Sequence, residues 1–389
     1  MSYSIPYLVL LACYLFLAII GYKVKNNHVL YQRIIFLCSI IYVIFFGLRG
    51  FIGWDWTNYY KKYQMASNLF NISFNSSVPE WGFTIYMSLF KTLFLDYYAF
   101  VFINVILHIF LLNIFLKRYL PPGYYVFGLI VFLVMGGFGM EVDAMRNIMS
   151  ILLFLLSIKY IEERKIGKYY ILNTVGLLFH ISSIFYLPLY FFLHKKMNRK
   201  LIVVIFIIGI IIFLLKIEYV KPLVLSISKI LGGRIQSITN DYLNSTIYGK
   251  SYGLSIGLLE RLLSAVLIIM YYPKLINASK HNIIFINAFV YYFFIFFYFS
   301  EIAIISIRVG MLFVFSYWIL WPSIIYVSKI KINRQFIICV MLLYSFLKMI
   351  GLTRFQLYQY DNKIFGIKTY EERKEIFDRI AHNILNNKT

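Results

Sequence analysis

The feature that most constrains the fold is a series of long apolar segments that recurs along the whole sequence. The runs are about 16 to 25 residues long, and about 20 residues of helix cross a hydrocarbon core of about 30 Å. Of the 389 residues, 61% are hydrophobic, and the mean hydropathy is +0.76. Soluble domains have an apolar content of only about 45 to 50%. We therefore expect an all-α polytopic integral membrane protein whose main partner is the lipid bilayer.

The expected spans make about twelve crossings. Residues 169–194 are predicted as a broken pair of half-helices, because a single helix would be about 37 Å long and would carry His180 and Pro188 near its middle. Residues 80–95 are amphipathic, so a re-entrant or interfacial segment is expected there. The spans are expected at residues 3–22, 33–48, 97–117, 122–137, 146–161, 169–194, 201–216, 256–272, 282–299, 303–327 and 335–352.

The spans and their loops are expected to form one transmembrane domain, residues 1–352, which includes a long outer loop at residues 218–255. Residues 353–389 follow the last span as a tail. Within the tail, the segment TYEERKEIFDRIAHNI has the pattern of an amphipathic helix that lies on a surface.

The excess of positive charge bears on topology more than on partners. The formal net charge is +22, but the basic residues are spread between spans, whereas a nucleic-acid binder gathers them on one soluble face. Basic loops favour the cytoplasmic side. This places Arg49–Val78, Gly136–Arg146, residues 218–255 and both termini on the outer side of the membrane.

The segment RGFIGWDWTNYY places polar groups at an outward helix end. It contains Arg49, Asp55, Tyr59 and Tyr60. One interpretation is an interfacial belt, because Trp and Tyr collect at headgroup depth and Arg extends toward it. Asp55 has no place in such a belt, so a ligand or a reaction is the other interpretation.

The segment GGFGMEVDAMRNIMS places Glu141, Asp143, Arg146 and Asn147 at an outward junction between a loop and a helix. Asp143 is suited to cap the following helix. An arginine one turn inside a span is costly unless it has a partner or faces water, and its fork of donors suits a phosphate or a carboxylate. Structural pairing with Asp55 or Glu141 and ligand binding both stay open for Arg146.

Further polar residues lie at other outward positions. His180 lies at the break of the expected broken pair, where a histidine also commonly bonds a neighbouring helix. Arg308 follows Glu301 by two helical turns, so we expect its partner on another helix or on a substrate. Arg234 and Arg261 would add to the same positive cavity, unless Arg261 pairs locally with Glu260.

Common enzyme signatures are absent from the sequence. It contains no HExxH, no GxxxxGK[ST] and no DxD motif, and its three cysteines show no CxxC spacing. A metal site and a nucleotide-dependent reaction in the cytoplasm are therefore disfavoured, and no cofactor is expected.

Several motifs together resemble a known family. They are R-x3-G-x-D-x3-YY from Arg49, E-x-G-F from Glu80, R-N-x-M-S from Arg146, LLFHISSI around His180, R-x-G-x-L-F from Arg308 and YQYDN from Tyr358. In order and spacing they resemble the EpsG-like branch of Wzy-type polysaccharide polymerases. Trp56 stands where that family usually has Tyr.

The resemblance implies a GT-C-like membrane fold and a polymerase. Its substrates would be undecaprenyl-pyrophosphate-linked oligosaccharides at the outer face of the bacterial plasma membrane, joined into O-antigen, capsule or exopolysaccharide. A chain-length regulator protein is a candidate partner. Arg146 and Arg308 would bind the pyrophosphate, and Asp55 or His180 would act as the base. The candidates for substrate binding are Arg49, Tyr59, Tyr60, Glu141, Arg234, Arg261, Tyr358 and Tyr360.

Other activities use the same kind of site. An O-antigen ligase takes the same donor but transfers the chain to a different acceptor. A flippase of the lipid-linked unit usually has inverted repeats, and no repeat is visible in this sequence. A membrane acyltransferase built around His180 would leave the arginines without a role.

Overall fold

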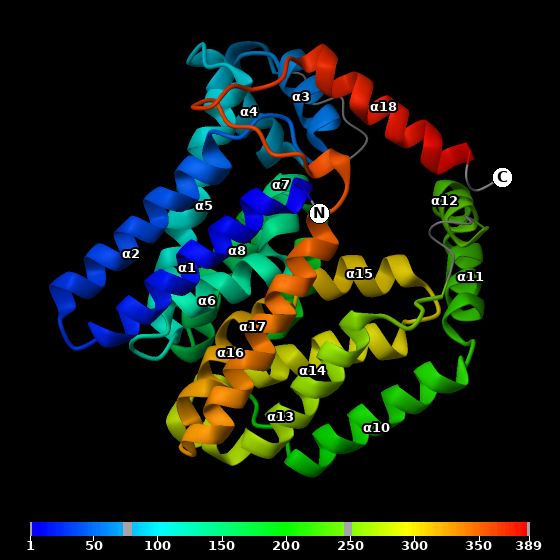
Figure 1. Ribbon diagram of the computed structural model, residues 1–389. Coiled ribbons are helices and arrows are strands. Elements are labelled where there is room, and N and C mark those ends of the chain that lie inside the picture. The colour runs from blue at the N-terminus through cyan, green and yellow to red at the C-terminus, as the bar shows by residue number, and fades with distance from the viewer. Residues whose placement is uncertain (1, 73–79, 245–250, 387–389) are drawn as a thin grey trace. The chain divides into compact units, whose positions relative to one another are not determined.

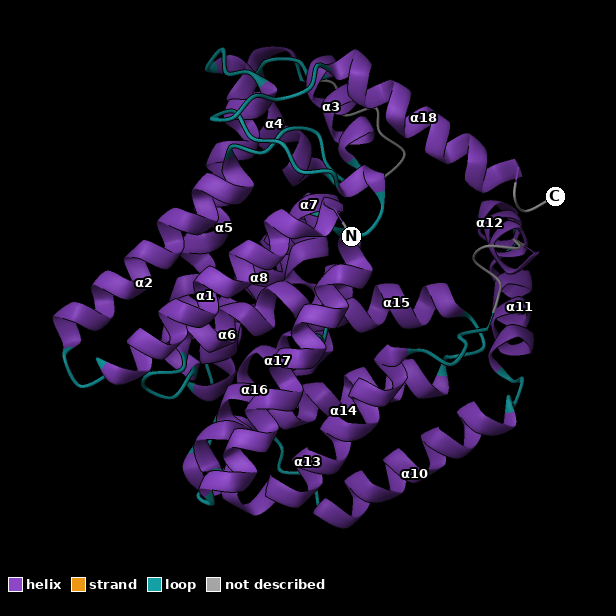
Figure 2. Ribbon diagram, in the orientation of Figure 1, coloured by secondary structure: helices purple, strands orange, loops and turns teal. Residues whose placement is uncertain are grey.

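The computed structural model describes residues 2–72, 80–244 and 251–386 (Figure 1). These residues are helical, and Figure 2 shows helices joined by loops with no strand drawn in the described part of the chain. Residues 73–79 and 245–250, which belong to two of the expected outward loops, lie outside the described residues. The chain divides into two compact units, Met1–Tyr190 with Ser328–Thr389, and Phe191–Val327.

The first unit contains both chain termini and most of the expected motifs. The helices α6, α7 and α8 are its most buried elements, and α8 packs on α5 and α9. Its helices are α1 (Ile5–Lys23), α2 (His28–Tyr42), α3 (Trp56–Met65), α4 (Trp81–Thr92), α5 (Tyr97–Tyr119), α6 (Tyr125–Phe132), α7 (Phe138–Asp143), α8 (Met145–Glu162), α9 (Ile166–Phe179), α17 (Lys331–Thr353) and α18 (Tyr370–Asn386), with the 3-10 helix Ile181–Phe191 following α9.

The second unit is built around α14, which packs on α10, α15 and α16. Its helices are α10 (Arg199–Leu215), α11 (Val220–Leu231), α12 (Gly233–Asn244), α13 (Ile256–Ala278), α14 (Asn282–Tyr298), α15 (Ala303–Met311) and α16 (Phe315–Val327). Residues 218–255, expected as a long loop, thus contain two helices among their described residues.

Polar side chains fix where helices of the first unit begin. The Asp96 carboxylate accepts a hydrogen bond from the backbone N–H of Ala99 (2.6 Å) and starts α5. The Asn27 side chain does the same for the N–H of Leu30 (3.1 Å) and starts α2. Such caps satisfy backbone donors that the first helical turn leaves open.

By length and apolar composition, six helices of the described residues are long enough to cross a membrane, or up to eight if two bent pairs each count as one span. Every expected span coincides with a helix or a helix pair. The expected number of about twelve crossings is not confirmed, because several of these helices are short. A multi-pass membrane protein follows from the long apolar helices alone.

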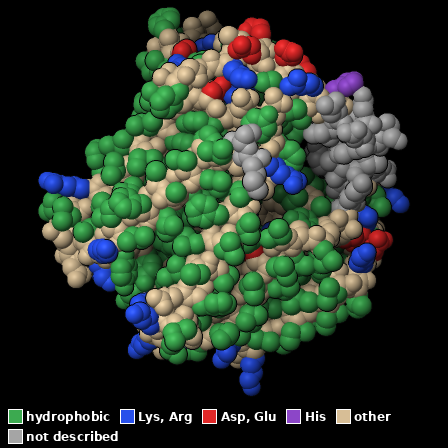
Figure 3. Space-filling view, in the orientation of Figure 1, with side chains coloured by type: hydrophobic (Ala, Val, Ile, Leu, Met, Phe, Trp, Pro, Cys, Tyr) green, Lys and Arg blue, Asp and Glu red, His purple; other side chains and the backbone are tan. Residues whose placement is uncertain are grey.

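The surface of α1, α2 and α17 agrees with a lipid environment. Figure 3 shows hydrophobic side chains covering the outer face of these helices. Phe16 is 64% exposed, Phe36 is 67% exposed and Phe336 is 69% exposed. Exposed apolar faces of this size are not stable in water, so the bilayer is their expected solvent.

One end of the first unit gathers basic loops. Lys117 donates to Gln32 (2.9 Å), and Arg118 pairs with Glu162 (3.1 Å). The Tyr31 hydroxyl accepts a hydrogen bond from the N–H of Gly123 (3.1 Å). The loops after α1, α5 and α8 therefore lie together, as the charge pattern predicts.

The opposite end of the first unit gathers the motifs. The Tyr7 hydroxyl donates to the Tyr358 carbonyl (2.7 Å), which places the start of α1 beside the end of α17. The N–H of Trp54 donates to Asp143 (2.6 Å), which joins the segment after α2 to the end of α7. The prediction that these segments share one side is confirmed within this unit.

The predicted break at His180 is present. Helix α9 ends there with extended backbone at His180, and a 3-10 helix follows. The Tyr169 hydroxyl donates to the Tyr186 carbonyl (2.5 Å), and the Tyr169 and Tyr190 rings lie 5.2 Å apart. The second limb therefore folds back along the first. Each limb spans about 21 Å, less than the core thickness of about 30 Å.

The expected span at residues 303–327 is a bent pair of helices. Helices α15 and α16 form this segment and meet at an angle of 66°. Glu301 precedes α15 and accepts hydrogen bonds from the backbone N–H groups of Tyr219 (2.9 Å) and Val220 (2.6 Å) at the start of α11. The Glu301 carboxylate therefore caps the N-terminus of α11.

Candidate functional site

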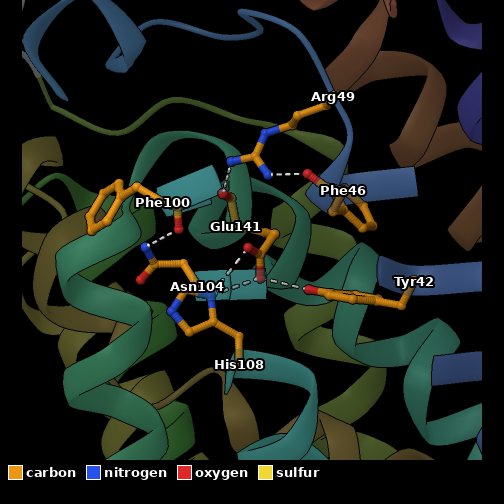
Figure 4. Close-up of polar contacts among 7 residues, drawn as sticks. All are labelled: Tyr42, Phe46, Arg49, Phe100, Asn104, His108 and Glu141. Atoms are coloured by element: carbon orange, nitrogen blue, oxygen red, sulfur yellow. Dashed lines mark hydrogen bonds and ion pairs between the residues drawn. The ribbon is translucent and has the colours of Figure 1, made fainter. Parts of the chain in front are cut away.

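A buried polar network lies beneath the motif end of the first unit (Figure 4). The Glu141 carboxylate is 1% exposed. It accepts a hydrogen bond from the Tyr42 hydroxyl (2.7 Å) and lies 3.1 Å from Nδ1 of His108. A carboxylate removed from water is stable only with such partners. Glu141 thus joins α2, α5 and α7.

Arg49 belongs to the same region and is 5% exposed. Its guanidinium donates to the backbone carbonyls of Phe46 (2.5 Å) and Glu141 (2.8 Å) (Figure 4). Opposite it, the Asn104 side chain donates to the Phe100 carbonyl (2.7 Å) on α5. The Arg49 contact with Phe46 satisfies a carbonyl at the end of the helix that contains Phe46.

His108 is a residue that the sequence interpretation missed. It is 2% exposed, and its Nδ1 faces Glu141 while its buried Nε2 has no hydrogen-bond partner among the residues that the structure describes. In the sequence, His108 lies in a continuous apolar run. No local motif marks it, because its partner is on a distant helix.

Asp143 fastens the segment that carries Asp55. Its carboxylate accepts hydrogen bonds from the backbone N–H of Trp54 (2.6 Å) and of Asp55 (3.3 Å), and from the Tyr358 hydroxyl (2.9 Å). The expectation that Asp143 caps the following helix is wrong, since Ala144 occupies that position. Burial and the adjacent Asp143 raise the pKa of the Tyr358 phenol.

Gly53 makes this clamp possible. Its φ is +85°, and a Cβ at this position would lie 2.1 Å from an Asp143 oxygen. A residue with a side chain is disfavoured by both the backbone conformation and the lack of space.

Arg146 lies at the start of α8 and forms an ion pair with Glu80 at the start of α4. Its guanidinium carbon also lies 5.8 Å from the centre of the Tyr59 ring on α3. The partner of Arg146 is therefore Glu80 of the E-x-G-F motif. The sequence had suggested Asp55 or Glu141 for this pairing. The Nε of Arg146 is buried and has no hydrogen-bond partner within the described part of the chain.

A cavity of about 330 Å³ opens beside this pair. Glu80, Arg146, Lys62 and Phe83 are among the residues that line it. Burial lowers the pKa of Lys62, and the nearby Arg146 lowers it further, while Asp55 acts in the opposite direction. Among the described residues that line it, the cavity thus has two cations, one carboxylate and an apolar wall. This set suits an anion joined to an apolar chain.

The remaining tyrosines of the candidate set hold the loops together. Tyr60 packs on Phe51 (5.1 Å) and Tyr97 (5.3 Å). The Tyr360 hydroxyl donates to the Phe45 carbonyl (2.9 Å), and the two rings stack at 4.3 Å. Burial raises the pKa of Tyr360 to about 12.

His180 lies close to the start of α8. Its Nδ1 accepts a hydrogen bond from the backbone N–H of Ser182 (3.2 Å) and lies 2.7 Å from the Ser182 hydroxyl. That hydroxyl donates to the side-chain Oδ1 of Asn147 (3.5 Å), and Asn147 follows Arg146. The Phe179 ring contacts Tyr86 of α4 at 5.7 Å. His180 therefore neighbours the two helices that carry the Arg146 and Glu80 pair.

The second unit holds the other predicted arginines. Arg308 is exposed on α15. Arg261 on α13 lies over the rings of Phe296 (3.8 Å) and Tyr292 (5.1 Å), and it donates to the Gly257 carbonyl (2.6 Å). The Arg234 side chain lies outside the described residues.

No group of three or more His, Cys, Asp and Glu side chains that could hold a metal ion occurs within residues 2–72, 80–244 and 251–386. The ionic groups at the cavity, Lys62, Glu80 and Arg146, are mostly cationic. The site as described is built from guanidinium, ammonium, carboxylate and imidazole groups.

Comparison with known proteins agrees with the motifs. No curated protein and no solved structure matches the chain. The model of the EpsG family matches residues 32–362, which include the cavity, the Asp143 clamp and the His180 hairpin of the first unit and all of the second unit. Because the match covers most of its length, this chain belongs to the EpsG family.

Proposed function

We propose that this protein is a glycosyltransferase that polymerises undecaprenyl-pyrophosphate-linked oligosaccharide repeat units into a surface polysaccharide. Membership of the EpsG family points to a polysaccharide polymerase in the membrane. The observation that carries the finer proposal is the cavity lined by Arg146, Glu80 and Lys62. A lipid pyrophosphate needs cations near the interface for its charge and lipid for its chain.

In the proposed reaction, a hydroxyl of the acceptor unit attacks the anomeric carbon of the donor chain. The bond from that carbon to the pyrophosphate oxygen breaks, and the lipid pyrophosphate leaves with the bond's electron pair. Negative charge grows on the leaving oxygen, so cations fixed beside it stabilise the transition state. We propose this role for Arg146 and Lys62, because both line the cavity of the first unit.

Glu80 keeps Arg146 in place before the substrate binds. The ion pair joins α4 to α8 and limits the rotamers of the arginine side chain. An incoming pyrophosphate offers a second set of acceptor oxygens to the same guanidinium. Among the described residues the buried Nε of Arg146 has no hydrogen-bond partner, so the side chain retains donor capacity for that contact.

Asp55 is the proposed base, and His180 the alternative. The N–H of Ser182 donates to Nδ1 of His180, so a neutral imidazole carries its proton on Nε2 and donates from there. A donor is suited to a sugar hydroxyl or the leaving oxygen. Asp55 precedes α3 and interacts electrostatically with Lys62 and Tyr59. These relations support Asp55 as the group that takes the proton.

The second unit is proposed to contribute Arg308 to pyrophosphate binding, with Arg261 and Arg234 as supporting cations. The exposure of Arg308 on α15 supports a role in binding. We further propose a GT-C-like architecture in a bacterial plasma membrane, with the motif end facing outward. A chain-length regulator is the proposed protein partner.

The proposal is tested by the lipid-linked glycans of a strain that lacks the gene. A polymerase defect leaves single repeat units on the lipid at the outer leaflet and removes the polymer. A ligase defect leaves long chains on the lipid, and a flippase defect leaves single units at the inner leaflet. Single outer-leaflet units that disappear when the gene is restored support the polymerase, and either other pattern contradicts it.

A further inference from the structure

The segment after α17 runs back over the loop that leads to Asp55. The N–H of Gly50 donates to the Asp361 carbonyl (3.1 Å), and the N–H of Gly53 donates to the Leu357 carbonyl (3.0 Å). A Cβ at Gly50 would lie 2.1 Å from an Asp361 oxygen. The two segments are therefore in close backbone contact, with no room for a side chain between them.

Helix α18 is tied to this crossing by an ion pair. Arg373 is 3% exposed and pairs with Asp361 (2.8 Å), the residue whose carbonyl binds Gly50. It also donates to the Gln359 carbonyl (2.6 Å). A buried, charge-assisted contact of this kind fixes geometry more strongly than the exposed pairs of the same helix.

The same helix covers α3 with aromatic rings. Tyr370 stacks on Tyr60 at 4.9 Å and meets Trp56 at 5.7 Å. Phe377 meets Trp56 at 6.1 Å and Trp54 at 6.0 Å. Trp54 and Trp56 are the residues on either side of Asp55, so α18 contacts both flanks of the proposed base.

We infer that residues 357–377, here called the C-terminal strap, hold the loop Arg49–Asp55 against the first unit and thereby place Asp55 for proton transfer. The inference rests on the proposed function. Within the strap, Arg373 is a positioning residue, because it acts on Asp55 through Asp361 and Gly50. The α18 part of the strap lies beyond residue 362, where the family match ends.

The test compares full-length variants in lipid nanodiscs. Arg373→Ala removes the ion pair, and Tyr370→Ala removes the ring contacts while leaving that pair in place. Arg379→Ala is the matched control, since Arg379 lies on the exposed side of the same helix and donates to Gln356 (3.2 Å). Two quantities are measured: amide hydrogen exchange of peptides within residues 49–60, and kcat and KM for a synthetic lipid-pyrophosphate repeat unit.

We expect Arg373→Ala to raise exchange of the 49–60 peptides about tenfold or more, while exchange in α5 and α8 stays unchanged. We expect kcat to fall about tenfold and KM to change less than about twofold, because a displaced base affects the chemical step more than binding. Tyr370→Ala is expected to show a smaller effect of the same kind, Arg373→Lys to recover part of the loss, and Arg379→Ala to match the wild type.

Wild-type exchange of the 49–60 peptides in Arg373→Ala and Tyr370→Ala overturns the inference, as does raised exchange with an unchanged kcat. If Arg373→Ala does not fold, the same two criteria apply to Tyr370→Ala alone. Exchange does not depend on activity. A wild-type protein without polymerase activity therefore contradicts the proposed function, while its exchange data still decide whether the strap holds the loop.

Discussion

At the scale of single residues, two arginines of the motifs have different surroundings. Arg49 is buried and donates to the backbone carbonyls of Phe46 and Glu141. Arg146 is paired with Glu80 at the edge of a cavity. A guanidinium whose donors are held by carbonyls stabilises the local fold, whereas one beside a cavity is available to a ligand. Arg146 is therefore the stronger candidate for binding the leaving group.

We predict that Arg146→Lys lowers polymer formation about 100-fold or more at a normal protein level. Lysine keeps the charge but lacks the planar fork that binds two oxygens together. Glu80→Gln, which removes the ion pair and leaves the arginine, is expected to have a smaller effect. The measurement is polymer per unit of membrane protein. Equal losses in both single variants, with no further loss in the double variant, would mean that Arg146 serves only to pair with Glu80.

We predict that Asp55→Asn lowers kcat about 100- to 10,000-fold while donor binding stays close to wild type. The amide keeps the size of the carboxylate and loses its basicity. His180→Gln is expected to retain a larger share of activity, because Nδ1 of His180 already accepts the Ser182 N–H. The assay uses purified variants with synthetic substrate. A fully active Asp55→Asn with an inactive His180→Gln would assign the base to His180 instead.

The sequence identified most of the polar residues of the candidate site, but it did not identify all of the contacts that they make. Arg146, Asp55 and His180 were found because charged groups at the ends of apolar runs are unusual. Lys62 was missed because a lysine between tyrosines resembles an ordinary interfacial residue. His108 and the clamp role of Asp143 were missed because they depend on partners from distant helices. Contacts of that kind leave no local pattern.

At the scale of elements, the sequence located the helices well and their bends less well. The break at His180 was predicted from a segment too long for one crossing, and the fold-back of Tyr169 onto Tyr186 confirms it. The 66° bend between α15 and α16 was missed, because residues 311–315 are apolar and contain no proline. Apolar composition indicates that a segment enters lipid, not that its helix is straight.

We predict that Gly53→Ala lowers activity while the protein still reaches the membrane. The positive φ and the 2.1 Å approach to Asp143 leave no place for a methyl group, so the clamp on the Asp55 segment must open. Gly139→Ala is the control, since a Cβ there meets no atom within 4 Å. Polymer is measured at matched protein levels. Wild-type activity in Gly53→Ala would show that the clamp is not required.

At the scale of the whole molecule, the sequence predicted that basic loops and polar motifs lie at opposite ends of the helices, and the structure of the first unit agrees. Within the first unit, the basic loops after α1, α5 and α8 lie at one end, and Asp55, Arg146 and His180 lie at the other. Which end faces outward follows from the positive-inside rule and is a prediction.

We predict that cysteine at Asn58 reacts with an impermeant thiol reagent in intact cells and that cysteine at Lys165 does not. Asn58 lies at the motif end and Lys165 at the basic end of the first unit. The native Cys13 and Cys339 are exposed and are replaced in both variants. Permeabilised cells provide the control for reactivity. Labelling of the Lys165 position in intact cells, without labelling at Asn58, would reverse the orientation.

The central claim is that the cavity at Arg146 supports polymerisation from a lipid pyrophosphate. The most direct measurement gives the purified protein only synthetic lipid-pyrophosphate repeat units and follows both products. The account predicts a ladder of lengthening glycans, one molecule of free lipid pyrophosphate released for each bond formed, and loss of both products in Arg146→Lys. Wild-type protein that folds and binds the repeat unit but forms no ladder, or an Arg146→Lys protein that forms the ladder at the wild-type rate, would contradict the account.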